Sequence, residues 1–432
     1  MSETTSGSGA RAKKASDIET HDTSVTHDDT SIAHDDEMTN LRRVSREFVP
    51  PARLRGTSKS LIRDFFDRAP SGSINLGLGE PDIRTPQIIT HAAMHAIEAE
   101  QNGYTTHAGL LGLRRLVAGD YEAAGASAES TIITAGSQEA LYLALMTLVD
   151  ADDEVLVPDP GFVAYPTMVR MAGGVSKRYR LPASVDFDFD IDEFRQAITP
   201  RTKVVIITSP SNPTGRALDE NQLKQIAEAL AETGAFVISD EIYRELYFTE
   251  HRPPSIADFY ARTIVISGLS KSLSMTGWRL GWLCGVASEQ DSIVHDAVKA
   301  ALVLHGYVTT CASTVSQKAA LVAWSSEAEA ARAGMRRTFR GRRDYLLARL
   351  KEMNLRGVAP DGAFYVMVDV SKHGTSMEIA ERALGHKVVT VPGMAFGAEG
   401  EGYLRLSFCA DKDMLDEGVR RLSAALTEGK EN

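Results

Sequence analysis

The chain has little cysteine. Its 432 residues contain only three, Cys284, Cys311 and Cys409, and no two of them form a CxxC pair. An odd number without paired spacing excludes a disulfide framework of the kind found in small secreted proteins, and it favours reduced thiols. None of the three has a base nearby in sequence, which argues against a catalytic thiol. We therefore expect each cysteine to be a small, buried, apolar residue.

Long apolar runs and an excess of positive charge are also missing. No apolar stretch approaches the roughly 20 residues that a membrane-spanning helix needs, and the N-terminus has no apolar core like that of a signal peptide. These absences predict a cytoplasmic protein. The 47 Lys and Arg residues against 58 Asp and Glu residues give a formal net charge of -11. This charge argues against nucleic acid or an anionic membrane surface as the main partner.

Residues 1–42 have almost no large apolar side chains, and they include the near-repeat HDTSVTHDDTSIAHDD (21–36). Low hydrophobicity with dense charge cannot offset the entropy lost on ordering, so we predict that this acidic polar tail is disordered. His21, His27 and His34 lie beside aspartates and could bind a divalent metal weakly. Because nothing fixes the geometry of these ligands, we predict no metal site.

Between about residues 100 and 310, short apolar runs alternate with amphipathic segments. The apolar runs are TIIT, EVLVP, KVVIITS, AFVISD and TIVISG, and a typical segment between them is DENQLKQIAEALAETG (219–234). This alternation is typical of βαβ units, and it predicts an α/β fold with a mostly parallel sheet and helices on both of its faces. After about residue 315, long charged helices precede short strands, which predicts a second, smaller α+β domain.

Lys271 stands in SGLSKSLSMTGWRLGW, shortly after the apolar run TIVIS (263–267) and eight positions before Arg279. A lysine among small polar residues at the end of a strand can carry a Schiff base, and an arginine just beyond it can hold a phosphate. This pairing indicates pyridoxal phosphate. Single motifs often match by chance, so the alternative for this segment alone is an ordinary surface lysine before a Gly-Trp turn.

Three further turns carry polar residues at the ends of apolar runs. Asn212 lies in SPSNPTG (209–215), and Asp240 and Tyr243 lie just past a strand end in ISDEIYRELYF (238–248). Gly136 and Ser137 lead from TIIT into a helix, whose first N–H groups and positive dipole end suit an anion. All four turns follow strands, so we expect them at one edge of a parallel sheet, where ligands of such folds bind.

In their order along the chain, these segments resemble fold-type I pyridoxal phosphate enzymes, and among them the class I/II aminotransferases of the bacterial aspartate and aromatic type. The resemblance covers nearly the whole chain after residue 50. Each motif alone is weak evidence for the family, but the complete set in this order is highly specific. It implies a large cofactor-binding domain over 96–315 and a small domain from 43–95 and 316–432. The motifs are GLGEPDIRTP (77–86), NGYTTHAGLLGLRR (102–115), TAGSQEAL (134–141), PDPGFVAYP (158–166), SPSNPTG, SDEIY, GLSKSLSMTGWRLGW, DGAFYVMVD (361–369) and YLRLSF (403–408).

The resemblance implies a role for each residue of these turns. Lys271 would carry pyridoxal 5'-phosphate as a Schiff base and later move the substrate α-proton. Asp240 matches the aspartate that keeps the pyridine nitrogen protonated, although an Asp after a strand is also a common helix N-cap. Asn212 and Tyr243 match donors to the ring 3-oxygen, and Arg279 matches the phosphate clamp.

Further residues match contacts to the phosphate. In many relatives a serine three positions before the lysine also binds this group, but here that position is Gly268. We expect either Ser270 or Ser267 to replace it. The backbone N–H groups and side chains that join Arg279 at the phosphate are those of Gly136, Ser137 and Gln138.

Four more positions match cofactor or substrate contacts. Phe162 aligns with the aromatic residue that stacks on the pyridine face, with a plain core aromatic as the competing interpretation. Tyr104 matches a tyrosine that reaches the phosphate of the neighbouring subunit, which implies a homodimer with shared active sites. Arg405 matches the arginine that binds the substrate α-carboxylate. A guanidinium suits this role because its planar fork pairs with both carboxylate oxygens. An inward-facing arginine on a strand also needs a partner of opposite charge, because burying an unpaired charge is costly. Gly79 would bring backbone close to the same carboxylate, with Asn212 beside the substrate.

The resemblance implies an aminotransferase that moves an amino group from an L-amino acid to a 2-oxo acid. Similar aspartate aminotransferases have a lysine, which can reach the distal carboxylate of aspartate, where this chain has Ser137. A second carboxylate would be buried here without an evident partner, unless Arg84 supplies one, so we predict a neutral amino donor.

Two alternatives to this function remain. One is a pyridoxal-phosphate-dependent lyase or cyclase, because fold and cofactor do not fix which bond breaks. The other is a non-catalytic regulator with an aminotransferase-like domain. Such a regulator needs a basic, folded N-terminal domain, and the acidic tail of this chain does not fit that requirement.

Overall fold

The computed structural model describes residues 48–55, 57–286 and 292–427. Residues Pro50–Asn432 form one compact unit. The tail predicted to be disordered, with its three histidines, lies outside the described residues. Among the described residues, no helix is long and apolar enough to cross a membrane. In the same part of the chain, no group of three or more His, Cys, Asp or Glu side chains is placed to hold a metal ion.

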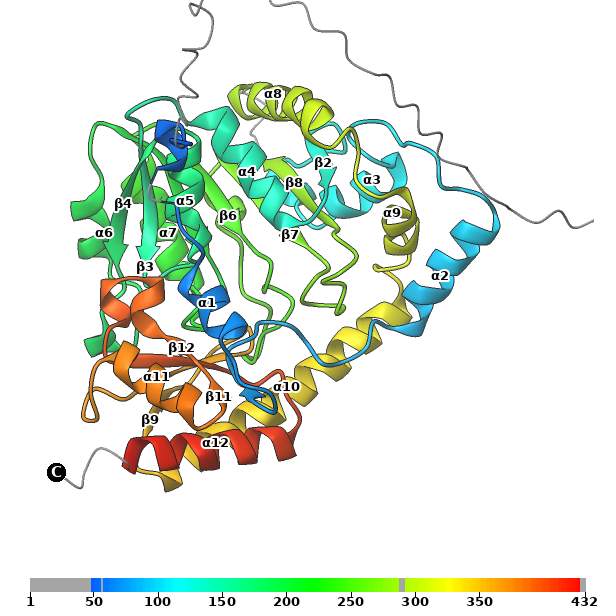
Figure 1. Cartoon of the computed structure of the whole chain (residues 1–432). Coiled ribbons are helices and arrows are strands. Elements are labelled where there is room, and N and C mark those ends of the chain that lie inside the picture. The colour runs from blue at the N-terminus through cyan, green and yellow to red at the C-terminus, as the bar shows by residue number, and fades with distance from the viewer. Residues whose placement is uncertain (1–47, 56, 287–291, 428–432) are drawn as a thin grey trace, which may run out of the picture. The chain divides into compact units, whose positions relative to one another are not determined.

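A seven-stranded sheet lies at the centre of the unit (Figure 1), with the spatial order β2-β8-β7-β6-β5-β3-β4. β8 runs antiparallel to its neighbours β2 and β7, and the other neighbouring pairs are parallel. The predicted α/β fold with a mostly parallel sheet is therefore confirmed. The strands are β2 (Thr131–Thr134), β3 (Glu154–Asp159), β4 (Val175–Arg180), β5 (Thr202–Thr208), β6 (Phe236–Asp240), β7 (Thr263–Gly268) and β8 (Gly281–Val286).

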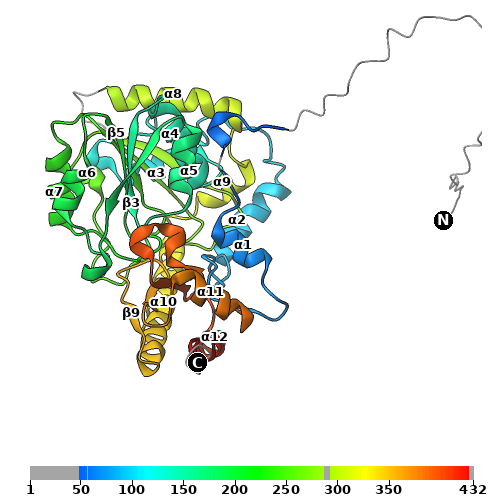
Figure 2. The same cartoon turned by 60° about the vertical axis from the view of Figure 1, so that its left-hand side comes forward.

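Helices cover both faces of this sheet (Figure 2). Successive side chains of a strand point to opposite faces. In β5, Val204 and Ile206 pack in one apolar cluster, while Val205 and Ile207 pack in another. The first face is covered by α4 (Ser137–Leu148), α5 (Ala164–Met171) and α8 (Ile293–Val308), and the second by α2 (Gln87–Glu98), α3 (Leu111–Gly119), α6 (Ile191–Ala197), α7 (Glu220–Leu230) and α9 (Thr314–Ala320).

The five strands predicted for this sheet are all present, whereas β4 and β8 were not predicted. β4 has the mostly polar sequence VSKRYR and is half-exposed at the edge of the sheet. β8 contains Gly281 and Gly285, and glycine weakens the sequence signal of a strand. A Cβ atom on Gly281 would lie 2.5 Å from the Ser137 nitrogen, and one on Gly285 would lie 2.6 Å from Val298. These glycines therefore allow α4 and α8 to approach the strand.

A second, antiparallel sheet has the order β12-β13-β10-β9 and lies below the central sheet in the view of Figure 1. β1 (Ile74–Asn75) pairs in parallel with β11 (Val388–Val389), so the segment after α1 (Leu61–Asp67) runs beside the C-terminal part of the chain. The remaining elements are β9 (Arg356–Val358), β10 (Tyr365–Asp369), β12 (Val391–Pro392), β13 (Tyr403–Ser407), α10 (Ser326–Glu352), α11 (Ser376–Gly385) and α12 (Lys412–Thr427).

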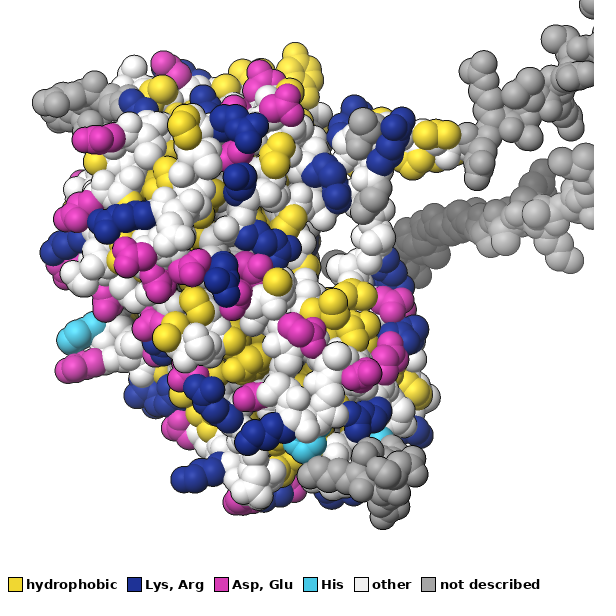
Figure 3. All heavy atoms as spheres, turned by 90° about the vertical axis from the view of Figure 1, so that its left-hand side faces the viewer, with side chains coloured by type: hydrophobic (Ala, Val, Ile, Leu, Met, Phe, Trp, Pro, Cys, Tyr) yellow, Lys and Arg dark blue, Asp and Glu magenta, His cyan; other side chains and the backbone are white. Residues whose placement is uncertain are grey.

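The three cysteines are free thiols. Cys284 and Cys409 are buried, as predicted, and burial raises the pKa of each thiol to about 12. The prediction is wrong for Cys311, which lies three residues beyond the end of α8 and is half-buried. On the face drawn in Figure 3, acidic and basic side chains are interspersed.

Candidate active site

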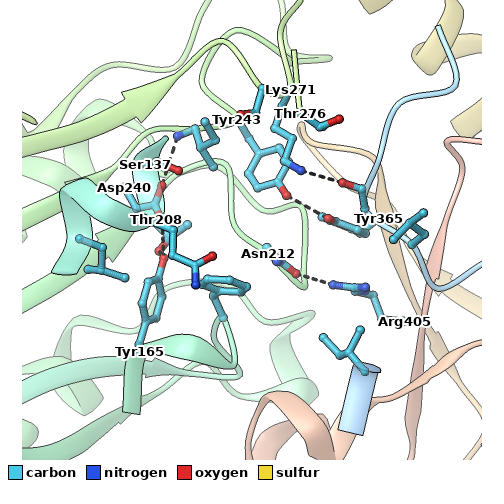
Figure 4. A pocket seen from close by; sticks show the side chains of 18 of the residues that line it. Ser137, Tyr165, Thr208, Asn212, Asp240, Tyr243, Lys271, Thr276, Tyr365 and Arg405 are labelled. Carbon is cyan, nitrogen blue, oxygen red and sulfur yellow. Dashed lines mark hydrogen bonds between the residues drawn. The ribbon is translucent and has the colours of Figure 1, made fainter. Parts of the chain in front are cut away.

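A cavity of about 270 Å³ lies at the carboxyl edge of the central sheet, between this sheet and the second one. Figure 4 shows how side chains from distant segments point into it. The four polar turns predicted to meet at one sheet edge do so here. The predicted site residues that line the cavity are Gly79, Ser137, Gln138, Phe162, Asn212, Asp240, Tyr243, Ser270, Lys271, Arg279 and Arg405.

Lys271 follows β7 by three residues and points into the cavity (Figure 4). Its Nζ donates a hydrogen bond of 2.7 Å to the carbonyl oxygen of Gly79. Burial lowers the pKa of this amine below its ordinary value, because desolvation disfavours the ammonium ion. A lysine that loses its proton more readily is suited to attack a carbonyl group, which an ordinary surface lysine is not.

Asp240 was predicted to lie just past a strand end, but it is the last residue of β6. Its Oδ2 accepts a hydrogen bond of 2.7 Å from the hydroxyl of Tyr165, which also lies 2.7 Å from Thr208 Oγ1. Burial raises the pKa of the Asp240 carboxyl to about 6, and the Tyr165 hydrogen bond opposes this rise. The residues after Asp240 form a turn and not a helix, so the alternative role as a helix N-cap is wrong.

Arg405, in the middle of β13, is buried without a carboxylate partner among the described residues. Its Nη1 donates to Asn212 Oδ1 at 2.8 Å and its Nη2 donates to the Gly77 carbonyl at 2.6 Å. The guanidinium lies 4.2 Å from the centre of the Tyr365 ring. Its buried Nε has no hydrogen-bond partner. A buried cation with an unsatisfied donor beside a cavity is arranged to accept an anionic group.

Tyr243 and Tyr365 form a pair of buried tyrosines at the same wall. Their hydroxyl oxygens are 2.9 Å apart (Figure 4). A Cβ atom on Gly79 would lie 1.9 Å from the Tyr365 hydroxyl. Only glycine at position 79 therefore allows Tyr365 to reach Tyr243 and the chain to pass beside Lys271.

The turn before α4 places Ser137 and Gln138, the first two residues of the helix, at the cavity, whereas Gly136 is not among the lining residues. Gly136 precedes the helix with a φ of 95°, a conformation that favours glycine. A Cβ atom there would lie 2.5 Å from Nη2 of Arg279. Arg279 is held by hydrogen bonds from Nη1 to the Thr276 carbonyl at 2.9 Å and from Nη2 to the Ala135 carbonyl at 3.3 Å. A guanidinium and a helix N-terminus thus meet at one point, which suits a phosphate group.

The two serines considered as replacements for Gly268 lie differently. Ser270 lines the cavity. The Ser267 hydroxyl donates to the Glu241 carbonyl at 3.0 Å and is not among the residues that line the cavity. A Cβ atom on Gly268 would lie 2.7 Å from the Leu280 carbonyl oxygen, so a serine does not fit at position 268.

Three other predicted residues lie at different distances from the cavity. Phe162 is half-buried, lines the cavity and packs edge-on against Tyr165 at 5.5 Å between ring centres. Tyr104 is 89% exposed and does not line the cavity of this chain. Arg84 is also exposed and is not among the lining residues.

Sequence reasoning missed Tyr165, Thr208, Thr276 and Tyr365, which also line the cavity. Tyr165 and Tyr365 stand in the motifs PDPGFVAYP and DGAFYVMVD. Nothing in either motif distinguishes these tyrosines from ordinary core aromatics. The apolar part of the wall, from Ile62, Phe66, Leu78, Leu141 and Ile242, gave no separate sequence signal either.

Comparison with known proteins identifies the class. The sequence profile described as "Aminotransferase class I and II" matches residues 71–422, and the chain belongs to this family. It is 36% identical over 373 residues to the probable aspartate aminotransferase of Methanocaldococcus jannaschii, covering 85% of this chain and 97% of that protein. It is 36% identical over 390 residues to the aromatic-amino-acid aminotransferase 2 of Thermococcus litoralis, covering 88% and 98%. A single mutant of Thermus thermophilus aspartate aminotransferase matches with a TM-score of 0.81 and 32% identity, covering 88% of this chain and 100% of that one.

The protein is therefore a pyridoxal-phosphate-dependent transferase that moves an amino group between an amino acid and a 2-oxo acid. The cavity fits this cofactor. It combines a buried lysine, a buried carboxyl group, a glycine turn that a Cβ atom would fill and a buried guanidinium with an unsatisfied donor. These are the groups needed to hold an aldehyde carbon, a ring nitrogen, a phosphate and a substrate carboxylate.

Proposed function

We propose that the preferred amino donor of this aminotransferase is a neutral L-amino acid, such as alanine or a larger apolar or aromatic one. The observation that carries the proposal is the charge of the cavity wall. Among its described lining residues the cations are Lys271, Arg279 and Arg405. In their proposed roles, Lys271 and Arg279 bind the cofactor and Arg405 binds the α-carboxylate, which every amino acid substrate has. No cation on this wall is then left to pair with the second carboxylate of aspartate. Burying that carboxylate unpaired would be costly.

Lys271 is the proposed point of attachment for the cofactor, through its amine as a Schiff base. Asp240 would pair with the ring nitrogen, while Asn212 and Tyr243 would donate to the ring 3-oxygen. Tyr165 positions Asp240 through the hydrogen bond to Oδ2. Pyridoxal 5'-phosphate, when bound, supplies a ring that takes up the electron pair left by the α-proton. The remaining proposed contacts are Phe162 against the ring face and, at the phosphate, Gly136, Ser137, Gln138, Ser270 and Arg279.

Arg405 is proposed to bind the α-carboxylate of the amino acid. The support is its planar guanidinium, which is buried, pressed against Tyr365 and left with an unpartnered Nε. Asn212 and the backbone at Gly79 lie beside it and would complete this site. With the carboxylate fixed there, the Lys271 amine is the nearby group that can remove the α-proton, and its lowered pKa supports that role.

We also propose a cytoplasmic homodimer in which Tyr104 reaches the phosphate of the neighbouring subunit. Its support is a surface of large exposed apolar side chains near Tyr104, which is typical of subunit interfaces. Val303 and Tyr307 on α8 are exposed. A Cβ atom on Gly306 would lie 2.7 Å from the His107 ring, so the segment with Tyr104 runs close to the end of α8.

The division into a large domain (96–315) and a small domain (43–95 and 316–432) remains part of the proposal. Its support is an apolar cluster that joins Phe65 and Leu76 to residues of β10, α11, β13 and α12. Ile89 and Ala93 of α2 instead pack with residues of α3 and α9, so the boundary would fall near α2.

The donor preference is tested by kcat/KM for alanine, leucine, phenylalanine and aspartate with one 2-oxo acid acceptor. Aspartate is the competing donor because relatives bear that name. We expect a neutral donor to lead, and Ser137→Lys should shift the ratio toward aspartate by about tenfold, or ~1.4 kcal/mol. A wild-type preference for aspartate above about tenfold would show the proposal to be wrong.

A further inference from the structure

Residues 393–400 connect the second sheet to the end of β3 in the central sheet. They follow β12 and form two short 3-10 helices, η5 (Gly393–Phe396) and η6 (Ala398–Gly400). The carbonyl oxygen of Phe396 accepts a hydrogen bond of 2.9 Å from the N–H of Gly161, which lies in the turn after β3. The 393–400 segment therefore bridges the two sheets whose edges form the active site.

The carboxylate of Asp159, the last residue of β3, makes a further contact to this segment. Its Oδ2 accepts a hydrogen bond from the Ala398 N–H and its Oδ1 accepts one from the Glu399 N–H, each at 3.2 Å. Arg178 on β4 pairs with Oδ2 at 3.1 Å. Asp159 is buried and is not among the described residues that line the active-site cavity. Its carboxylate therefore serves the 393–400 segment, and hydrogen bonds to such a charged acceptor are stronger than those between neutral groups.

Gly397 makes this contact possible. Its φ of 144° lies in the region that favours glycine. A Cβ atom there would lie 1.9 Å from Oδ1 of Asp159 and 2.3 Å from Nη1 of Arg178. The backbone N–H groups of the next two residues can therefore reach the carboxylate only because position 397 has no side chain.

A cavity of about 210 Å³ lies beside this contact and is lined by both segments. Pro158 and Phe162 line it from the β3 side, and Ala395 and Phe396 line it from the other. The two segments thus do not pack closely along their whole length, in contrast to a filled protein interior. The hydrogen bonds of Asp159 and Gly161 must then determine how the 393–400 segment is placed against the central sheet.

The ring of Phe396 extends from this segment to the substrate side of the active site. It is buried, and the guanidinium of Arg405 lies 4.7 Å from its centre. Tyr365 is the second aromatic contact of the same guanidinium, at 4.2 Å. Two rings against one guanidinium attract the cation and limit the directions in which its donors can point. The position of Phe396 therefore affects the orientation of Arg405.

We propose that Asp159 is a positioning residue for binding of the amino acid. It holds the 393–400 segment, and through that segment it holds the Phe396 ring against Arg405. This inference rests on the proposed role of Arg405 as the site of the substrate α-carboxylate. Asp159 contributes no group to the active-site cavity, so its loss should weaken binding of the amino acid without removing a catalytic group.

The test uses the holoenzyme and the amino donor that leads the comparison of kcat/KM described above. Asp159→Asn keeps the size of the side chain but replaces one acceptor oxygen with a donor, so one backbone N–H group loses its partner. We expect KM for the amino donor to rise roughly fivefold with little change in kcat. Dissociation of the cofactor from the holoenzyme should stay unchanged. A merely structural role would also loosen the turn that carries Phe162, and the cofactor would then dissociate faster.

Asp190→Ala is the matched control. The carboxylate of Asp190 also accepts hydrogen bonds from two backbone N–H groups, those of Asp192 and Glu193, but it caps the N-terminus of α6. This variant should lower the melting temperature and leave KM for the amino donor unchanged. A loss of stability by itself is thereby separated from an effect on substrate binding.

A double variant tests the route through Phe396. Asp159→Asn combined with Phe396→Leu should raise KM no more than the larger single change, because both changes act on the same ring. If Asp159→Asn does not fold, Arg178→Gln removes the partly exposed charge partner of this carboxylate instead, and KM should rise roughly twofold. An unchanged KM in the variant that folds, a faster loss of the cofactor, or effects that multiply in the double variant would overturn the inference.

Arg405→Lys distinguishes a failure of this inference from a failure of the proposed function. An unchanged KM in Arg405→Lys would show that the α-carboxylate binds elsewhere, and the positioning role of Asp159 would fall with that site. A raised KM in Arg405→Lys with an unchanged KM in Asp159→Asn would overturn the positioning role alone. Raised values in both variants, with the cofactor retained, would support the inference.

Discussion

The hydroxyl of Tyr165 on α5 donates a hydrogen bond of 2.7 Å to Oδ2 of Asp240 at the end of β6. Both groups are buried, and the same hydroxyl contacts Thr208 at the end of β5. A hydrogen bond to a carboxylate favours its charged form, which opposes the effect of burial on Asp240. The tyrosine therefore helps to keep an anion in a place where burial would otherwise neutralise it.

Tyr165→Phe should remove the hydrogen bond that favours the charged form of the Asp240 carboxyl. The hydrogen bond to a charged group contributes about 1.5–3 kcal/mol, so kcat/KM should fall by roughly tenfold or more. The acidic limb of its pH profile should also move to higher pH. Tyr179→Phe is a matched control, because Tyr179 is equally buried but donates to the Ile206 carbonyl away from the cavity. An unchanged pH profile in Tyr165→Phe would contradict the argument.

The pKa of Asp240 makes the stability of the cofactor-free enzyme depend on pH. Burial raises this pKa from 3.8 to about 6, so between these values the folded state holds a proton that the unfolded chain has released. The Asp240 carboxyl therefore contributes stability that is fully present below its unfolded pKa of 3.8 and is lost as pH rises through its folded pKa of about 6. The size of this contribution is about 3 kcal/mol, at roughly 1.4 kcal/mol for each pKa unit. Denaturation of wild type and Asp240→Asn across this range should show the difference, and parallel curves would contradict it.

The strands that carry the site could be predicted because the runs before Asn212, Asp240 and Lys271 are rich in Val and Ile. Parallel strands of this kind bring their carboxyl ends to one edge of the sheet. The partners of these residues could not be predicted in the same way. Tyr165 meets Asp240 across 75 residues of chain, and Tyr365 meets Tyr243 across 122. Contacts of that separation depend on tertiary packing, and a tyrosine at a core position has the same local pattern with or without them.

The proposed attachment of the cofactor to Lys271 can be tested chemically. Borohydride reduction should fix the cofactor to the wild-type chain, and Lys271→Ala should lose both the fixed cofactor and nearly all turnover. Lys299→Ala is the matched control, because Lys299 is exposed and pairs with Asp296 on α8. Recovery of the cofactor on a peptide with another lysine would refute the assignment.

Gly79→Ala should damage the substrate side of the cavity through Tyr365. The added Cβ atom would lie 1.9 Å from the Tyr365 hydroxyl, so the ring must move away from Tyr243 and from the Arg405 guanidinium that packs on it. Overpacking of this kind costs about 1–3 kcal/mol, and the displaced guanidinium should raise KM for the amino acid more than it lowers kcat. Gly341→Ala is the control, because nothing lies within 4 Å of a Cβ atom there and position 341 is inside α10. That change should instead stabilise the helix by roughly 0.5–1 kcal/mol. An unchanged KM and melting temperature in Gly79→Ala would contradict this prediction. Such a result would mean that the Tyr365 ring can move without disturbing the fold, and that its contact with Arg405 does not affect binding of the amino acid.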